Sequence, residues 1–304
     1  MLRFLGNRLL QSAVVLLGVS AIVFFCLFLA GDPAALMMSP DASRAEIDAF
    51  RKAMGFDDPV LVQYLRYLGK ALTGDFGLSL RFQRPVLELV LERLPATALL
   101  AVAALAWSTT LGFVFGVLAA IKPGGLVDFL VRTVALAGQA VPVFWLGLVL
   151  ILFFAMKWRL LPTGGYGEAR HLILPALTLG AYYTSAVTRL VRASLIDVMG
   201  EDYIRTARAK GLSPGRVIIG HALRNALIPV LTVQAMYFAA LLGGALVTEI
   251  IFAWPGIGRL AVQAIQNRDF PLVQAVVLLA STVFVLANLM VDIAYVLLNP
   301  RIRL

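Results

Sequence analysis

The sequence is poor in the residues that build metal centres and disulfide bonds. Among its 304 residues there is one cysteine, Cys26, and there are two histidines, His171 and His221. A single cysteine excludes an intrachain disulfide and a metal site of the cysteine type, and two histidines disfavour a transition-metal cage. No nucleophile with a placed base is visible either. We therefore expect no catalytic residue, no metal site and no cofactor bound by this chain.

Charged residues are also scarce. They make up 14% of the chain, whereas hydrophobic residues make up 61%, and the mean hydropathy is +0.89. A water-soluble fold cannot hide so much apolar surface, so the composition predicts a membrane protein. The formal net charge of +9 would suit nucleic acid. The cations instead gather at the ends of apolar runs and in one central segment, so we expect membrane lipid and no nucleic acid as a partner.

Apolar segments of sufficient length to cross a hydrocarbon core of about 30 Å occur six times. They are approximately Leu9–Leu29, Ala96–Ile121, Val131–Met156, Leu172–Val191, Leu227–Ile250 and Leu272–Leu298. The fourth is the least apolar, and we expect it to face protein or a water-filled path. The predicted fold is an all-α membrane protein with six transmembrane helices.

The distribution of lysine and arginine predicts the orientation of these helices. With the N-terminus inside, the inner short segments hold most of the cations and the outer short segments hold few. Both termini and the central segment, residues 197–226, should therefore be cytoplasmic. The long segment of residues 31–95 should lie on the outer face as a small cap, with helical pieces around Ser43–Met54 and Leu61–Leu72.

These assignments predict an organisation in four parts. They are an N-terminal anchor helix (1–30), an outer segment (31–95), a five-helix core (96–298) that contains the central segment (197–226) and an outer loop (251–271), and a cytoplasmic tail (299–304). Inside the core, Gly112 and Gly116 have the spacing that lets two helices approach closely, which we interpret as packing within the chain.

The central segment is polar and basic and carries helix-ending signals. Asp197–Lys210 reads as one short helix, and Gly211 follows it where a left-handed residue is needed. Ser213 and Pro214 then suit the start of a second helix that runs toward Ala226. The spacing of the first helix places Met199, Tyr203 and Ala207 on one face and Arg205 and Arg208 on another. From this pattern alone, a helix on the membrane surface and a protein docking element remain equally open.

The central segment also resembles the cytoplasmic loop of permease subunits of bacterial ABC importers. The segment is most similar to the B-type permease of the dipeptide, oligopeptide and nickel branch. The similarity lies in the sequences RTARAKGL and ALRNALIPV. Arg205, Thr206 and Ala207 stand where that family has its EAA triplet, and Gly211 is its glycine. Further stretches match the family in order along the chain: 31–34 (GDPA), 74–79 (GDFGLS), 93–97 (RLPAT), 249–260 (EIIFAWPGIGRL), 268–274 (RDFPLVQ) and 299–303 (NPRIR).

The resemblance implies a type I importer permease fold. It implies that a coupling helix, seated in a groove of a cytoplasmic ATPase, is formed by Tyr203, Arg205, Thr206, Ala207, Arg208 and Gly211. It places on the periplasmic face, where a binding protein delivers cargo, a loop that contains Trp254, Pro255, Gly256, Gly258 and Arg259. Trp254 is equally readable as a stiff aromatic turn or as an interfacial anchor.

Polar residues inside the apolar segments are candidates for a translocation pathway. We assign Gln139, Gln234 and Asn288 to it, although amides also bond across helices. Asp292 lies near the inner end of its segment and should be paired or near water, since an unpaired acid in hydrocarbon is costly. The glycine spacing of residues 215–220 lacks the lysine of a phosphate loop, so ATP binding by that mechanism is not expected.

The sequence thus predicts the membrane subunit of an ATP-driven importer of the bacterial inner membrane, for di- or oligopeptides or similar solutes. Its expected partners are a homologous C-type permease that completes a heterodimer, two ATPase subunits that bind ATP and magnesium, and a periplasmic binding protein. Nickel, glutathione or an opine-like compound are alternative cargoes. A secondary carrier is disfavoured, because the ionisable pairs in two related halves that such carriers use are not apparent.

Overall fold

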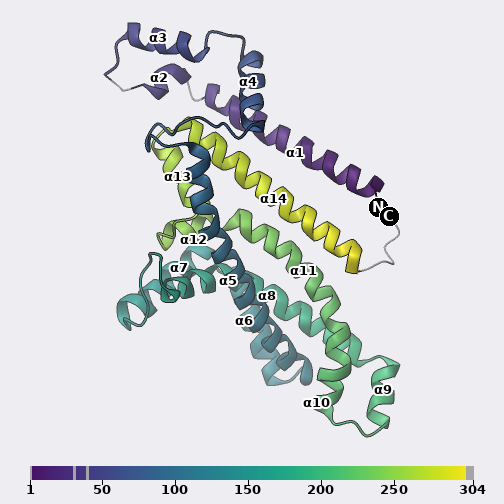
Figure 1. Ribbon diagram of the computed structural model, residues 1–304. Helices are drawn as coiled ribbons and strands as arrows, with labels where there is room; N and C mark the ends of the chain where they lie inside the picture. The colour runs from purple at the N-terminus through teal and green to yellow at the C-terminus, as the bar shows by residue number, and fades with distance from the viewer. Residues whose placement is uncertain (1, 30–31, 39–40, 299–304) are drawn as a thin grey trace. The chain divides into compact units, whose positions relative to one another are not determined.

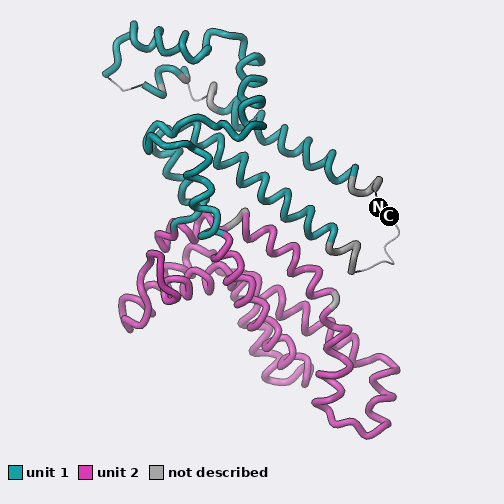
Figure 2. The backbone as a smooth tube through the Cα atoms, viewed as in Figure 1, with its two compact units in different colours: residues 1–97, 255–304 teal, residues 98–254 magenta. Residues whose placement is uncertain are grey.

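The computed structural model of the chain describes residues 2–29, 32–38 and 41–298. These residues form helices joined by turns, with one isolated antiparallel bridge between Leu78 and Pro85 and no strand among them (Figure 1). The predicted all-α class is confirmed, and the expected tail of residues 299–304 lies outside the described residues. The chain forms two compact units, residues 1–97 with 255–304 and residues 98–254 (Figure 2).

The first unit contains two long helices that lie side by side (Figure 1), α1 (Leu2–Leu29) and α14 (Phe270–Leu298). The Arg8 guanidinium in α1 lies 3.1 Å from the Asp292 carboxylate in α14, so the prediction that this acid is paired is confirmed. The first turns of α5 (Val86–Ile121) pack on α14 and on α13 (Ile257–Gln266) through a core that includes Leu89, Leu260 and Leu272.

The cap segment, residues 31–95, holds α2 (Pro33–Met37), α3 (Arg44–Met54) and α4 (Val60–Leu72). The two helical pieces expected there are α3 and α4. Ser43 and Glu46 form a reciprocal capping box at the start of α3, where unpaired backbone N–H groups need acceptors.

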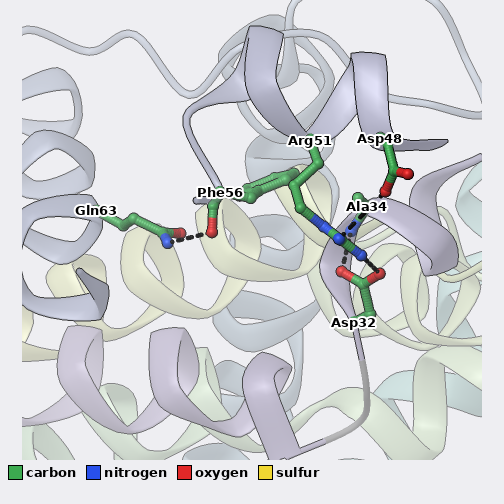
Figure 3. A network of polar contacts seen from close by, with 6 residues as sticks. All are labelled: Asp32, Ala34, Asp48, Arg51, Phe56 and Gln63. Atoms are coloured by element: carbon green, nitrogen blue, oxygen red, sulfur yellow. Dashed lines mark hydrogen bonds and ion pairs between the residues drawn. The ribbon is translucent and has the colours of Figure 1, made fainter. Parts of the chain in front are cut away.

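Polar contacts tie the cap elements together (Figure 3). The Arg51 guanidinium of α3 bonds to Asp32, which caps α2, and also lies 3.3 Å from Asp48. The amide of Gln63 in α4 donates to the Phe56 carbonyl at 3.0 Å and to the Asp58 carbonyl at 2.8 Å. These bonds connect α3 with α2 and connect α4 with the loop that precedes it.

Tyrosines of α4 fasten the cap to α1. The Tyr64 hydroxyl lies 2.9 Å from Ser20 Oγ and 3.2 Å from the Leu17 carbonyl oxygen. The Tyr67 ring stacks on Phe24 with a centroid distance of 5.6 Å, and both residues line a cavity of about 490 Å³. The Tyr67 hydroxyl is buried without a hydrogen-bond partner among the described residues, and burial raises the pKa of Tyr67 to about 12.

The second unit is organised around α8 (Ala169–Met199). Against it pack α6 (Leu126–Ala140), α7 (Val143–Leu150), α11 (Leu223–Gly244) and α12 (Leu246–Ile251). The shorter elements of this unit are the π-helices η1 (Ile151–Lys157) and η2 (Val217–Ala222), α9 (Asp202–Ala209) and α10 (Pro214–Arg216).

Small residues let α5 approach α8 within the second unit. A Cβ atom on Gly112 would lie 2.7 Å from Val187 Cβ, and one on Gly116 would lie 2.6 Å from Val191 Cβ. No side chain fits at either position without a shift of α8. The interpretation of this glycine pair as packing within the chain is confirmed.

The described helices differ in how they suit a membrane. Three, α1, α5 and α14, are long and apolar enough to cross it, and five spans result if two bent helix pairs each count as one. One pair, α6 with α7 and η1, bends by 107°. The third predicted segment is therefore not one helix, because Pro142 lacks an N–H and holds Val141 in an extended conformation. The fourth lies in α8, which is long but more polar.

Candidate functional site

The central segment consists of two helical pieces, but the first is shorter than expected. The predicted helix Asp197–Lys210 is interrupted, because α8 ends at Met199 and α9 begins only at Asp202. Gly200 closes α8, and Glu201 is extended with φ −69° and ψ 149°. Glycine is a poor helix former, which explains why the chain can turn there. The turn makes α9 a separate helix that is attached to the end of a long one.

The turn after α9 has the predicted geometry. Gly211 has a φ of +77°, and its N–H donates to the Arg208 carbonyl at 2.9 Å. Only glycine adopts this left-handed conformation without strain. Ser213 is extended and Pro214 is the first residue of α10, so the predicted start of the second helix is also confirmed.

The second helical piece extends beyond the expected end at Ala226. α10, η2 and α11 follow one another without a break from Pro214 to Gly244. Pro229 lies inside this run, which bends by 50° there. The central segment is therefore continuous with a membrane-segment helix, and a displacement of one end can move the other.

One face of α9 is buried against the second unit. Ile204 is 0% exposed and Ala207 is 7% exposed, and they share a core with Leu195 of α8 and Val217 of η2. The predicted apolar face contains Tyr203 and Ala207, but the side chain of Tyr203 is 40% exposed. The buried residues of α9 are Ile204 and Ala207, so Tyr203 lies at the border of the buried face.

Tyr203 has a different role at the edge of α9. Its hydroxyl accepts a hydrogen bond of 2.7 Å from the side-chain amide of Asn225 in α11. This bond and the core around Ile204 join α9 to α8, η2 and α11. Sequence inspection missed Asn225, because no local spacing links residues that lie 22 positions apart.

The opposite face of α9 is basic and exposed. Arg205, Thr206 and Arg208 are exposed, and the Arg205 guanidinium makes only a loose contact of 3.3 Å with Asp202, whose side chain is also exposed. Such surface pairs contribute little to stability. The cations are consequently available to a partner, on a helix whose other face is anchored.

A hollow follows on the second helical piece. Its volume is about 420 Å³, and it is lined by Leu212, Gly215, Arg216, Ile219, Gly220 and His221. Ile219 is 74% exposed on this surface. Ile219 is the one exposed large apolar side chain among these lining residues.

The loop assigned to the periplasmic face has a buried tryptophan. Trp254 is 1% exposed and meets the Tyr166 ring edge to face, at 4.9 Å between centroids. The interfacial-anchor interpretation is wrong, because an anchor must present its ring to the lipid headgroups. Its neighbours Pro255, Gly256, Gly258 and Arg259 belong to the first unit, where the N–H of Ile257 donates to Thr97 Oγ1 at 2.9 Å.

The three pathway candidates lie on three helices. Gln139 in α6 and Gln234 in α11 belong to the second unit, and Asn288 in α14 belongs to the first. Gln234 is 7% exposed, and neither polar atom of its amide has a partner among the described residues. Asn288 donates to the Phe284 carbonyl of its own helix at 2.8 Å. Gln234 is thus a candidate whose buried amide has unused hydrogen-bonding capacity.

Comparisons with known proteins match the whole length of the chain. The profile described as the binding-protein-dependent transport system inner membrane component matches residues 112–304, and the profile of the N-terminal part of such membrane components matches residues 1–101.

Two similar curated proteins are full-length matches. The glutathione transport system permease protein GsiC of Escherichia coli K12 is 43% identical over 304 residues, which cover 100% of this chain and 99% of that protein. The probable peptide ABC transporter permease protein y4tP of Sinorhizobium fredii is 43% identical over 309 residues and covers 99% of both chains.

A solved structure has a similar fold. A chain of the MetNI methionine ABC transporter in an inward-facing conformation superposes with a TM-score of 0.52 and 18% identity. The match covers 67% of this chain and 95% of that chain. At 18% identity this similarity supports the arrangement of the helices and nothing more specific.

Proposed function

The chain belongs to the family of binding-protein-dependent transport system inner membrane components, and from this membership we propose its cargo, its partners and its coupling residues. It is a permease subunit of an ABC importer in the inner membrane, with the type I permease fold, and it is a transport component and not an enzyme. The expected membership in the permease subunits of ABC importers is therefore confirmed.

We propose that the cargo is a di- or oligopeptide or a similar small solute such as glutathione. The observation that carries this proposal is the 43% identity, over the full length, to permeases named for glutathione and for peptides. No contact among the described residues favours nickel or an opine-like compound, and uptake of nickel is one outcome of the test. Cargo choice also depends on the binding protein that delivers it.

The proposed partners are a C-type permease, two ATPase subunits and a periplasmic binding protein. ATP and magnesium would bind to the ATPase subunits, because the chain offers no phosphate loop at residues 215–220. The proposed orientation places both termini and the central segment in the cytoplasm, where the ATPases are. The loop from Trp254 to Arg259 would then face the binding protein.

We propose that α9 and the turn at Gly211 receive the movement of the ATPases. Arg205, Thr206 and Arg208 would contact the ATPase, since they form the exposed face of α9. Ile204 and Ala207 would pass the movement to Leu195 and Val217 through their shared core. Because these side chains are tightly packed, α9 would move together with the adjoining parts of α8 and η2. The hollow lined by Ile219 would share the docking surface.

The proposed translocation pathway includes Gln139, Gln234 and Asn288. A buried amide without partners costs about 1–3 kcal/mol, so Gln234 should gain a partner in the assembled importer. Cargo in transit or a residue of the C-type permease would supply it. Alternating access then follows from two arrangements of the helices, whose balance is set by ATP bound to the partners.

The test of the proposed cargo is uptake by the importer reconstituted in proteoliposomes with its binding protein. Peptides of two to six residues, glutathione and nickel would each be offered with and without internal ATP. The proposal predicts ATP-dependent uptake of a peptide or of glutathione. Uptake of nickel alone, or uptake that does not need ATP, would overturn it.

A further inference from the structure

A basic hollow lies between α6 and α8 in the second unit. Its volume is about 420 Å³, and it is lined by Phe129, Arg132, Thr133 and Leu136 of α6 and by Arg189 and Arg192 of α8. This basic hollow is separate from the surface of α9, and the proposed coupling does not use its three arginines.

The positive charges of the basic hollow exceed the negative charges beside them. Asp128 accepts hydrogen bonds from Arg192 at 2.5 and 2.8 Å, and the Arg132 guanidinium lies 3.5 Å from the same carboxylate. Arg189 is exposed and forms no ion pair with any described residue. Two guanidinium groups therefore share one carboxylate, and the third lines the hollow without an ion pair among the described residues. An anionic ligand would compensate the excess.

The walls of the basic hollow are apolar and exposed. Phe129 is 58% exposed and Leu136 is 62% exposed, and both belong to a helix of a bent membrane-segment pair. In a membrane protein, such side chains contact lipid chains. A ligand that satisfies both the arginines and these walls has an anionic head and an apolar tail.

The depth of the arginines suits a lipid headgroup. Arg132 is six residues from the start of α6 at Leu126, a rise of about 9 Å along the helix. Arg189 is ten residues from the end of α8 at Met199, a rise of about 15 Å along the helix. Arginine side chains at this depth extend toward the headgroup region while their stems stay in the apolar layer.

We propose that the basic hollow binds an anionic phospholipid. The phosphate would lie against Arg132 and Arg189, and an acyl chain would lie along Phe129 and Leu136. Basic pockets between membrane helices bind acidic headgroups in this way. In the proposed orientation the lipid belongs to the cytoplasmic leaflet. The choice of leaflet rests on the proposed function, whereas the binding site does not.

The experiment measures lipid binding to the purified full-length chain in detergent by native mass spectrometry. Phosphatidylglycerol and phosphatidylcholine with the same acyl chains are the two lipid probes, and glycerol phosphate is the soluble competitor. The assembled importer is measured in the same way. The variants are Arg189→Gln and the double variant Arg132→Gln with Arg189→Gln, whereas Arg192 is kept because it pairs with Asp128. Lys122→Gln removes one exposed cation from the α5–α6 turn and serves as the matched control.

The proposal predicts that phosphatidylglycerol binds more tightly than phosphatidylcholine. Each arginine removed should weaken the binding of phosphatidylglycerol by about fivefold, which corresponds to the usual contribution of one cation near an acidic headgroup. Lys122→Gln should leave the preference unchanged, and Arg189→Lys should restore most of it.

Four outcomes would overturn the proposal. They are equal binding of the two lipids, an equal loss in Lys122→Gln, displacement of the lipid by soluble glycerol phosphate, and absence of the lipid from the assembled importer. The third would indicate a site for a soluble anion, and the fourth would indicate that another subunit covers the basic hollow. Uptake is not the readout, so each outcome is independent of the proposed cargo.

Discussion

Arg192 in α8 donates two hydrogen bonds, of 2.5 and 2.8 Å, to the carboxylate of Asp128 in α6. The Asp128 side chain is 0% exposed and also accepts the N–H of Gly124 at 2.8 Å. One carboxylate therefore joins α6, α8 and the turn that precedes α6. The contact fixes two helices that both border the basic hollow.

Asp128→Asn should destabilise the protein strongly. Asp128 is buried but Arg192 is 23% exposed, so water screens part of the charge that the variant leaves unpaired, and the cost should be about 1–3 kcal/mol. Thermal unfolding in detergent measures the loss. Asp202→Asn is the control, because its pair with Arg205 is exposed and contributes at most about 0.5 kcal/mol. Equal melting temperatures for the two variants would contradict the assignment.

Gly116→Ala should disturb the packing of α5 on α8. The added methyl group would lie 2.6 Å from Val191 Cβ and 2.8 Å from the Thr188 carbonyl oxygen. Overpacking of this kind costs about 1–3 kcal/mol. Gly18→Ala in α1 is the control, since no atom lies within 4 Å of the place that its methyl group would take. A lower melting temperature for Gly18→Ala than for Gly116→Ala would refute this packing.

Gly211→Ala should cost about 1 kcal/mol of stability, because alanine is strained at a φ of +77°. No atom lies within 4 Å of the added methyl group, so the cost is conformational and not steric. Gly211→Asn should restore part of the loss, since asparagine tolerates this conformation better. Gly220→Ala, in a helix with open space around it, should be neutral or slightly stabilising. Unfolding midpoints of the three variants distinguish these cases.

Tyr67→Phe should leave the cap as stable or stabilise it by up to about 1 kcal/mol. The variant removes a buried hydroxyl that has no partner among the described residues, and it keeps the ring that stacks on Phe24. Tyr64→Phe is the matched comparison, because it removes the bonds to Ser20 and to the Leu17 carbonyl and should cost about 1 kcal/mol. Hydrogen exchange in α4 reports both changes. The reverse order would show that Tyr67 has a partner.

Local signals in the sequence were sufficient for part of this structure. The left-handed turn at Gly211, the helix start at Pro214 and the close approach at Gly112 each follow from one residue type at one position. Such features depend on the backbone preferences and the sizes of glycine and proline, which are known from the residue type alone. The high cost of an unpaired acid in hydrocarbon also predicts that Asp292 has a partner. That cost does not identify the partner, which is Arg8.

Long-range contacts could not be inferred in the same way. The bond between Tyr203 and Asn225 and the burial of Trp254 against Tyr166 depend on how distant segments pack. The break at Gly200 was missed because a helical pattern continued across it. The compact units also divide the chain after residues 97 and 254, so α14 groups with α1 and not with the expected core. The predicted domain boundaries remain predictions.

The most direct test of the coupling role of α9 is ATP-driven uptake by the reconstituted importer. The double variant Arg205→Glu with Arg208→Glu reverses the exposed face of α9 and leaves Ile204 and Ala207 in place. The matched control, Arg44→Glu with Lys52→Glu, reverses two exposed cations of α3 in the cap. The account predicts that the α9 variant folds, as judged by its melting temperature, but loses most uptake, while the control retains it. Uptake by the α9 variant equal to that of the unaltered importer would contradict the account.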